Sequence, residues 1–226
     1  MSEFDSGFFI RWFREHGRSF PWRKDETTPF QTLATEMLLR QTQAMQVERV
    51  WNDFMARFGR PEDLAAADEQ ELFEYVVELG FGNQRTRALQ AAATHLLEEH
   101  EGRVPRQEEQ LLSIPHIGSY SAQAVRCFAF AEAVPVVDTN ILRLFCRLEG
   151  RQVRRPDVRR TDWAWEEAAS LLPSSGTEAQ KHNYGLLDFT AQVCLPRSPA
   201  CEDCPLSPNC PYGQAVLNGK EPVAPW

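Results

Sequence analysis

Lysine is scarce in this sequence, and long apolar runs are absent. Of the 24 basic residues only Lys24, Lys181 and Lys220 are lysines, and none lies between residues 25 and 180. Covalent catalysis through an amine requires lysine, because arginine stays protonated. The central part of the chain therefore excludes a Schiff-base nucleophile. No apolar run reaches 18 residues, so we expect no transmembrane helix and no membrane partner.

The N-terminus also lacks the order of a secretory signal. Residues 1–13, MSEFDSGFFIRWF, begin acidic, whereas a signal peptide begins basic and continues apolar. We therefore expect a cytoplasmic protein. The formal net charge is −8, which argues against a generally sticky nucleic-acid binder.

The negative charge is not evenly spread. Residues 111–160 carry eight basic and four acidic side chains, whereas residues 61–110 carry four basic and twelve acidic ones. A basic segment with acidic flanks suits a soluble protein that binds a polyanion on one face. An unevenly charged, solvated surface would give the same counts.

Helical periodicity dominates the chain and strand-like runs are scarce, which predicts an all-α fold of about ten helices. Apolar spacing predicts a first helix ending at Gly17 and one or two helices over residues 30–59. Further helices are expected to start at Pro61 and Asp68, and another to stop at Gly102.

A short turn interrupts two apolar runs in the basic segment. Residues 111–125, LLSIPHIGSYSAQAV, place Pro, His, Gly and Ser between them, which predicts two helices joined by a hairpin, the second over 119–130. Backbone N–H groups at the start of that second helix could bind a phosphate without lysine. A hairpin in any helical bundle can have a similar sequence.

Six cysteines fall as two singles and one cluster. Cys127 and Cys146 lie in apolar surroundings and are expected in the core. The cluster has the spacing C-x6-C-x2-C-x5-C, and in a cytosolic chain a metal site is favoured over disulfides. Its unequal gaps favour an iron–sulfur cluster, with zinc as the alternative. Its members are Cys194, Cys201, Cys204 and Cys210.

Two carboxylates have ordinary explanations when each is taken alone. Asp138 follows an apolar run and would cap the next helix, a contribution of about 1 kcal/mol. Glu36 lies among apolar neighbours in a helix and could simply point to solvent.

Taken together, the hairpin, Asp138 about twenty residues beyond it, and the four-cysteine loop resemble the helix-hairpin-helix DNA glycosylases of the endonuclease III superfamily. The resemblance runs from Phe20 to Cys210. It implies two helical lobes with a DNA cleft between them. A six-helix barrel with the hairpin would span 30–137, an iron–sulfur lobe 1–29 plus 138–212, and a weakly structured tail 213–226.

The resemblance also implies an activity in base excision repair. Such enzymes swing a mispaired or damaged base out of double-stranded DNA and hydrolyse its N-glycosidic bond. Asp138 would stabilise positive charge on the sugar, and Glu36 would protonate or polarise the departing base. Tyr120 would pack against the base or hydrogen-bond to it. The four cysteines would hold a [4Fe-4S] cluster, in a nucleoid-associated monomer.

Other positions receive roles from the same resemblance. Gln41 and the loop residues Phe81, Gly82 and Asn83 are candidates to fill the gap left by the base. The expected DNA contacts are His116, Gly118, Ser119, Gln41, Asn83, Arg85, Asn140 and Arg143, and the expected base pocket includes Ala44 and Tyr184. The superfamily normally has glycine at the position of His116, so a positive φ there would cost about 1–2 kcal/mol.

The target base is less well defined. Tyr120 stands where bifunctional members have lysine, so we expect a monofunctional enzyme without Schiff-base lyase activity. Residues 82–85, 102–106 and 183–189, together with Ala44, resemble the branch that excises thymine or uracil opposite guanine. Tyr184 matches neither branch well.

The adenine branch, acting opposite guanine or 8-oxoguanine, is the alternative. It is similar at Glu36, at residues 41–43 and at Tyr120, but normally has Asp-Gly-Asn at 138–140 and an additional C-terminal domain. The chain ends 16 residues after Cys210, so no such domain is expected. A non-catalytic iron–sulfur DNA-binding protein is a remote alternative.

Overall fold

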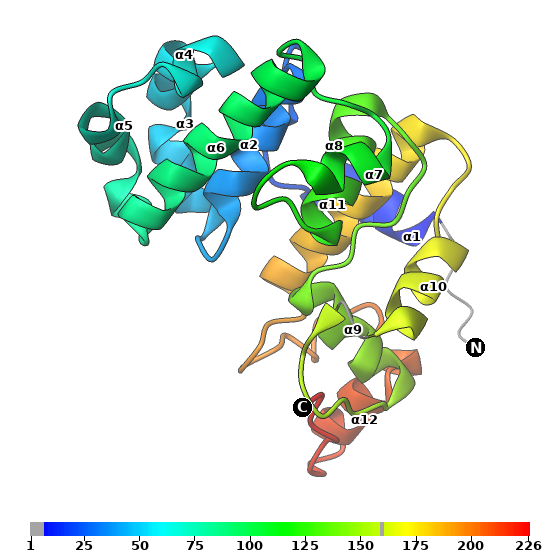
Figure 1. Ribbon diagram of the computed structural model, residues 1–226. Helices are drawn as coiled ribbons and strands as arrows, with labels where there is room; N and C mark the ends of the chain where they lie inside the picture. The colour runs from blue at the N-terminus through cyan, green and yellow to red at the C-terminus, as the bar shows by residue number, and fades with distance from the viewer. Residues whose placement is uncertain (1–6, 159–160) are drawn as a thin grey trace. The chain divides into compact units, whose positions relative to one another are not determined.

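The structure, a computed structural model, describes residues 7–158 and 161–226 (Figure 1). These residues form helices and loops with no strand among them, which confirms the predicted all-α fold. None of the described helices has the length and apolarity needed to cross a bilayer. The acidic start of the chain, residues 1–6, and two arginines of the basic segment, Arg159 and Arg160, lie outside the described residues.

The chain divides into two compact units. The continuous unit is Ser19–Ala131, and the discontinuous unit joins Met1–Arg18 to Glu132–Trp226. From the sequence we expect the boundaries between the units after residues 29 and 137, whereas in the structure they lie after residues 18 and 131. Each unit has its own hydrophobic core.

The continuous unit contains seven α-helices in its described residues. Its core is built around Leu38, Phe54, Phe58 and Leu89, none of which exposes any of its surface. α4 and α5 pack on α6, and α2 packs on α8. The helices are α2 (Pro29–Leu39), α3 (Ala44–Phe58), α4 (Pro61–Ala65), α5 (Glu69–Val76), α6 (Gly82–His100), α7 (Glu108–Ser113) and α8 (Ser119–Phe130), with the 3-10 turns η1 (Pro21–Arg23) and η2 (Val77–Leu79).

The helical region from 30 to 59 is two helices, not one. α2 begins with a capping box in which the Thr28 hydroxyl accepts from the N–H of Gln31 and the Gln31 side chain accepts from the N–H of Thr28. It stops at Leu39 because Gln41 adopts a left-handed backbone conformation with φ 54°. The break produces an exposed loop, 40–43, which carries one of the expected DNA contacts.

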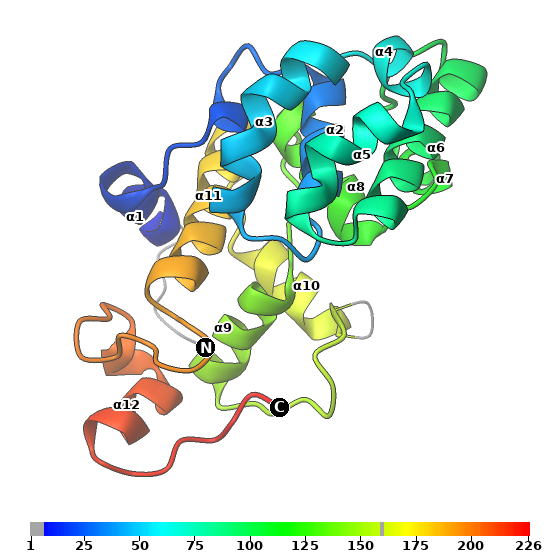
Figure 2. The same cartoon turned by 90° about the vertical axis from the view of Figure 1, so that its left-hand side faces the viewer.

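The discontinuous unit brings the first helix of the chain onto a late one. Figures 1 and 2 show α1 (Phe8–His16) beside α11 (Gly176–Gln192), and the two pack closely where α11 has Gly185. A Cβ at Gly185 would collide with the carbonyl oxygen of Phe9 and lie 2.9 Å from its carbonyl carbon. The end of α1 is then fixed by Arg18, which donates to the fully buried carboxylate of Asp188 through both its backbone N–H and its guanidinium, each at 2.8 Å.

The rest of the discontinuous unit includes α9 (Thr139–Glu149), α10 (Asp162–Ser170), the 3-10 turn η4 (Ser207–Asn209) and α12 (Pro211–Leu217). α12 covers part of the tail expected to be weakly structured from residue 213. The helix forms because Pro211 suits a first-turn position and the Cys210 sulfur accepts from the N–H of Gly213 at 3.4 Å. Beyond it, the N–H of Val153 donates to the carbonyl of Pro225 at 2.8 Å.

Candidate active site and nucleic-acid interface

Asp138 caps α9, as its sequence position predicts. One carboxylate oxygen accepts from the N–H of Ile141 at 2.7 Å, and the other accepts from the side-chain amide of Asn140 at 2.7 Å. The carboxylate is half-buried, and burial raises its pKa above the ordinary aspartate value. The two hydrogen bonds and the nearby Arg143 partly offset that increase. Asp138 is thus a desolvated carboxylate in a fixed orientation.

Arg143 holds the amide that orients Asp138. Its guanidinium donates to the Asn140 side-chain oxygen at 2.7 Å, which turns the NH₂ group of Asn140 toward the aspartate. The same guanidinium donates to the carbonyl of Cys194 at 2.7 and 3.1 Å and to that of Thr190 at 3.0 Å. Arg143 is only 3% exposed, and these protein acceptors occupy the group that was expected to contact DNA. In the structure Arg143 supports Asn140 and the end of α11.

The extended segment before Asp138 is fixed by a side chain of α11. Asn183 accepts from the N–H of Val136 at 3.2 Å and donates to the carbonyl of Val134 at 3.0 Å. Val136 and Val137 are fully buried. The buried segment before Asp138 and its hydrogen bonds to the Asn183 side chain therefore fix the position of Asp138.

The other two expected catalytic residues belong to the continuous unit. Glu36 is 6% exposed in α2, where its neighbours from Thr32 to Leu38 are all buried. The structure therefore excludes the simple explanation of a solvated glutamate. Tyr120 is half-buried in the first turn of α8, the helix on which α2 packs. Glu36 is thus buried, whereas Tyr120 remains partly accessible.

The hairpin between α7 and α8 forms as predicted. Ile114 and Ile117 are buried and anchor it, while His116, Gly118 and Ser119 are exposed at the start of α8. His116 has φ 66°, the left-handed backbone conformation that favours glycine. A Cβ at Gly118 would meet nothing within 4 Å, so the N-terminus of α8 is open. Such an end suits a phosphate.

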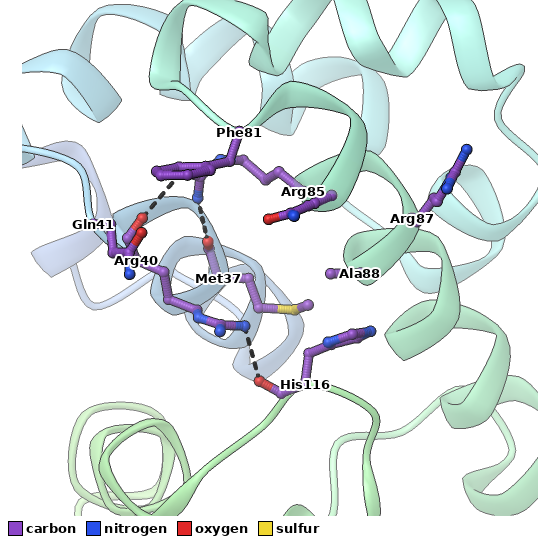
Figure 3. Close-up of a pocket in the computed structure, with 9 residues that line it drawn as sticks. Met37, Arg40, Gln41, Phe81, Arg85, Arg87, Ala88 and His116 are labelled. Carbon is purple, nitrogen blue, oxygen red and sulfur yellow. Dashed lines mark hydrogen bonds between the residues drawn. The ribbon is translucent and has the colours of Figure 1, made fainter.

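A pocket of about 510 Å³ lies beside this hairpin in the continuous unit (Figure 3). Three of its lining residues, Gln41, Phe81 and His116, are non-glycine residues with positive φ, of 54°, 55° and 66°. Such backbone costs about 1–2 kcal/mol per residue and often accompanies functional sites. The pocket also has the basic side chains Arg40 and Arg87, and the Arg40 guanidinium donates to the His116 carbonyl at 3.2 Å.

Arg85 also lines the pocket but does not offer its charge to a ligand. It is 6% exposed, and its guanidinium donates to carbonyls of the loops that carry Gln41 and Phe81. Burial lowers its pKa, with a further contribution from Arg40. Like Arg143, it was expected to contact DNA and instead supports the protein. Asn83 at the start of α6 is exposed and remains available.

The two expected base-pocket residues occupy different units. Ala44 begins α3 and is half-buried in the continuous unit. Tyr184 is half-buried on α11 of the discontinuous unit, where its ring stacks on Phe13 with centroids 5.7 Å apart and planes at 26°.

The four clustered cysteines gather at the end of α11 and the start of α12. All are free thiols, and Cys194, Cys201 and Cys210 are at most 8% exposed. Burial raises the pKa of Cys201, Cys204 and Cys210, and neighbouring cluster thiols raise each further. Arg147 donates to the Cys194 sulfur at 3.3 Å. Bound iron would stabilise thiolates that otherwise repel one another, so this donor set fits an iron–sulfur cluster.

A preformed metal-binding group is not found in the described part of the chain. Among residues 7–158 and 161–226, no group of three or more histidine, cysteine, aspartate or glutamate side chains is arranged to hold a metal ion. The other two cysteines, Cys127 and Cys146, are fully buried in the core as predicted, and burial raises the pKa of Cys146 to about 11.

Three arginines at the cysteine loop and the pocket were not predicted from the sequence. Arg147 contacts the cysteine loop, since it also donates to the carbonyls of Leu195 at 2.7 Å and Pro196 at 3.0 Å. Its spacing of four residues from Arg143 on one predicted helix was the available signal. No comparable sequence signal marks Arg40 and Arg87, because the pocket they line forms from three separate segments.

Comparison with known proteins assigns the family. The description "HhH-GPD superfamily base excision DNA repair protein" fits residues 34–166, which include the hairpin, Glu36 and Asp138. The chain belongs to this superfamily. The resemblance seen in the sequence is thereby confirmed, and this HhH-GPD protein is a DNA glycosylase by family.

Two curated relatives represent two branches of the HhH-GPD superfamily. The chain is 35% identical over 195 residues to a thymine/uracil-DNA glycosylase of Methanothermobacter thermautotrophicus, covering 86% of each protein. It is 36% identical over 199 residues to an adenine DNA glycosylase of Mycobacterium tuberculosis, covering 87% of this chain and 64% of that protein. A solved thermostable thymine-DNA glycosylase aligns with a TM-score of 0.84 at 32% identity, covering 92% of this chain and 94% of that one.

Proposed function

We propose that this HhH-GPD protein is a monofunctional glycosylase that hydrolyses the N-glycosidic bond of thymine or uracil opposite guanine in duplex DNA. The observation that carries the proposal is Asp138, a desolvated carboxylate oriented by Ile141 and Asn140 at the start of α9. The membership of the chain in the HhH-GPD superfamily indicates the class of reaction, which is base excision.

The proposed role of Asp138 follows from how charge develops during the reaction. As the bond from deoxyribose to base breaks, positive charge grows on the sugar and negative charge on the base. A carboxylate removed from water interacts more strongly with that cation than an exposed one would. Asn140 and Ile141 hold it in place, so little reorganisation is needed at the moment of reaction.

Glu36 is proposed to act on the leaving base. It is only 6% exposed in α2, and a carboxyl group held out of water beside the base could protonate or polarise it as the bond breaks. Tyr120 would contact the base with its ring or hydroxyl. Because Tyr120 stands where the bifunctional members have lysine, attack by an amine is unavailable there, and water is the proposed nucleophile.

Similarity to the thymine/uracil-DNA glycosylase and to the solved thymine-DNA glycosylase supports a pyrimidine target. Ala44 and the stretches 82–85, 102–106 and 183–189 are the sequence features that favour it. Excision of adenine opposite guanine or 8-oxoguanine is the second candidate, supported by the mycobacterial adenine glycosylase at nearly equal identity.

The four cysteines are proposed to hold a [4Fe-4S] cluster. Their burial, mutual influence and the N–H and guanidinium donors to sulfur support that assignment. The cluster would hold together a loop that contains four prolines and has little core of its own. No catalytic step is assigned to it.

The test is excision under single-turnover conditions from T:G, U:G and A:8-oxoguanine duplexes, followed by alkali to reveal abasic sites. Cleavage of the T:G and U:G strands only after alkali is expected. Asp138→Asn should abolish it, while Asp68→Asn, which alters the cap of α5, should not. Activity on the adenine duplex alone would favour the second candidate. Strand breaks without alkali, or an adduct trapped by borohydride, would refute monofunctional chemistry.

A further inference from the structure

Arg85 makes an unusual set of hydrogen bonds for an arginine. It lies near the start of α6, and its six acceptors are five backbone carbonyls and one hydroxyl. The guanidinium is almost completely removed from solvent, at 6% exposure of the residue. Its acceptors are the carbonyls of Met37 (2.6 Å), Leu38 (2.9 Å), Arg40 (3.0 Å), Leu79 (3.3 Å) and Gly80 (3.3 Å) and the hydroxyl of Thr42 (2.9 Å).

These acceptors belong to two loops that are far apart in the sequence. The first, residues 37–42, ends α2 and contains Gln41, and the second, residues 79–81, contains Phe81. Thr42 joins them directly, because its hydroxyl donates to the carbonyl of Leu79 at 2.9 Å. We call Arg85 and Thr42 the clamp. Figure 3 shows the bonds from Arg85 to Met37 and Arg40 at the pocket.

The clamp adjoins the two strained positions of this region. Gln41 and Phe81 have φ of 54° and 55°, and each follows directly on a residue whose carbonyl Arg85 binds. Without those bonds the two residues would relax toward the ordinary right-handed regions. The carbonyls would also need other donors, because buried polar groups are costly when unpaired.

The strained residues present apolar and amide side chains to solvent. Phe81 is 60% exposed, and Gln41 is exposed across the same pocket. Two more exposed apolar side chains flank the loops, Met45 at 61% and Val77 at 43%. A large apolar side chain held in water has a cost that a soluble protein usually avoids, unless the side chain enters a partner. Base pairs unstacked by extrusion offer such an environment.

We propose that Arg85 is a positioning residue, which holds Gln41 and Phe81 in the geometry needed to fill the gap left by an extruded base. The inference rests on the proposed glycosylase function. Arg85 acts through the two loop tips, because its guanidinium is occupied by protein carbonyls and does not reach DNA. Preorganisation saves the entropy of ordering both loops during base extrusion.

A double-mutant cycle tests whether Arg85 acts through Gln41 and Phe81. Arg85→Lys keeps the charge but cannot reach six acceptors from one ammonium group. It is made in the parent protein and in Gln41→Ala/Phe81→Ala, and base extrusion is followed by fluorescence of 2-aminopurine beside a T:G mismatch, together with the single-turnover rate. Arg85→Lys should lower extrusion and excision about 30-fold in the parent, but less than about 3-fold when the tips are already absent.

A structural role would give a different pattern. If Arg85→Lys causes the same loss with and without the tips, or none in the parent, the proposal is wrong. Arg57→Lys is the matched control, because Arg57 forms an exposed pair with Glu71 in the same unit. It should change neither readout by more than about 2-fold.

A second variant and a second outcome cover the cases in which Arg85→Lys does not fold or the parent does not excise a base. If Arg85→Lys does not fold, as judged by thermal melting, Thr42→Val removes the bonds that the Thr42 hydroxyl makes with Arg85 and with the Leu79 carbonyl. It should lower extrusion about 5-fold only in the presence of the tips, and equal losses in both backgrounds would overturn the proposal. If the parent excises no base from any duplex, the proposed function fails. The fluorescence cycle still decides the role of Arg85, because extrusion precedes chemistry.

Discussion

Replacing Arg143 with lysine should damage both stability and catalysis, because this one guanidinium links Asn140 to the end of α11. It makes four hydrogen bonds, to the Asn140 side chain, to the Cys194 carbonyl twice, and to the Thr190 carbonyl. A lysine ammonium keeps the charge but has a single nitrogen, which cannot contact acceptors on both sides of the arginine fork. We expect it to retain about half of these bonds.

The magnitude follows from the bonds that are lost. A hydrogen bond from a charged donor contributes about 1.5–3 kcal/mol, so the free energy of unfolding should fall by about 3 kcal/mol. The rate should fall as well, because Asn140 without Arg143 is free to turn its amide away from Asp138. Loss of about 2 kcal/mol of transition-state stabilisation corresponds to about 30-fold in rate.

The assay combines urea unfolding with single-turnover excision from a T:G duplex, measured well below the unfolding temperature of the variant. Arg57→Lys is the control for an exposed arginine that leaves both quantities nearly unchanged. If Arg143→Lys excises within about 2-fold of the parent rate, the orientation of Asn140 does not depend on Arg143. The proposed support of Asp138 by Arg143 through Asn140 would then be wrong.

Four other predictions concern pH, packing and metal. Burial raises the pKa of Asp138, so ionisation of its carboxyl group destabilises the fold as the pH rises through that pKa. Asp138→Asn should therefore have a higher melting temperature than the parent at pH 7, and the difference should be gone near pH 3. Equal melting temperatures at pH 7 would contradict this prediction. The rate of the parent should fall with acid at a pH above the ordinary aspartate value of 3.8, as a rate profile will show. Gly185→Ala should lower the free energy of unfolding by about 1–3 kcal/mol because its Cβ meets the backbone of Phe9, whereas Gly118→Ala, with open space, should melt like the parent; calorimetry distinguishes them. Cys204→Ser should reduce bound iron and lower the melting temperature, while Cys127→Ser should retain iron; zinc in place of iron on elemental analysis would rule out the cluster.

Features with a local cause were predictable from the sequence. The helices that end at Gly17, begin at Pro61 and begin at Asp68 depend on caps and breakers within a few residues, and the structure has them. The capping of α9 by Asp138 belongs to the same class.

Features that depend on distant segments could not be predicted in the same way. The sequence marks Arg85 as a cation but does not reveal that two loops present carbonyls to it. The same holds for Arg143, whose acceptors follow it by about fifty residues. In both, a charge that would ordinarily stay in water is stabilised by several carbonyls that only the folded chain brings together.

The path of the backbone through the discontinuous unit has a consequence for biosynthesis. On a ribosome, Ser19–Ala131 emerges as one uninterrupted stretch and can fold while the remainder is still being made. α1 leaves the exit tunnel before this stretch but must wait for α11, more than 150 residues later, before its apolar face is covered. During that interval Phe9 and Trp12, which are buried in the folded protein, lack the helix that covers them.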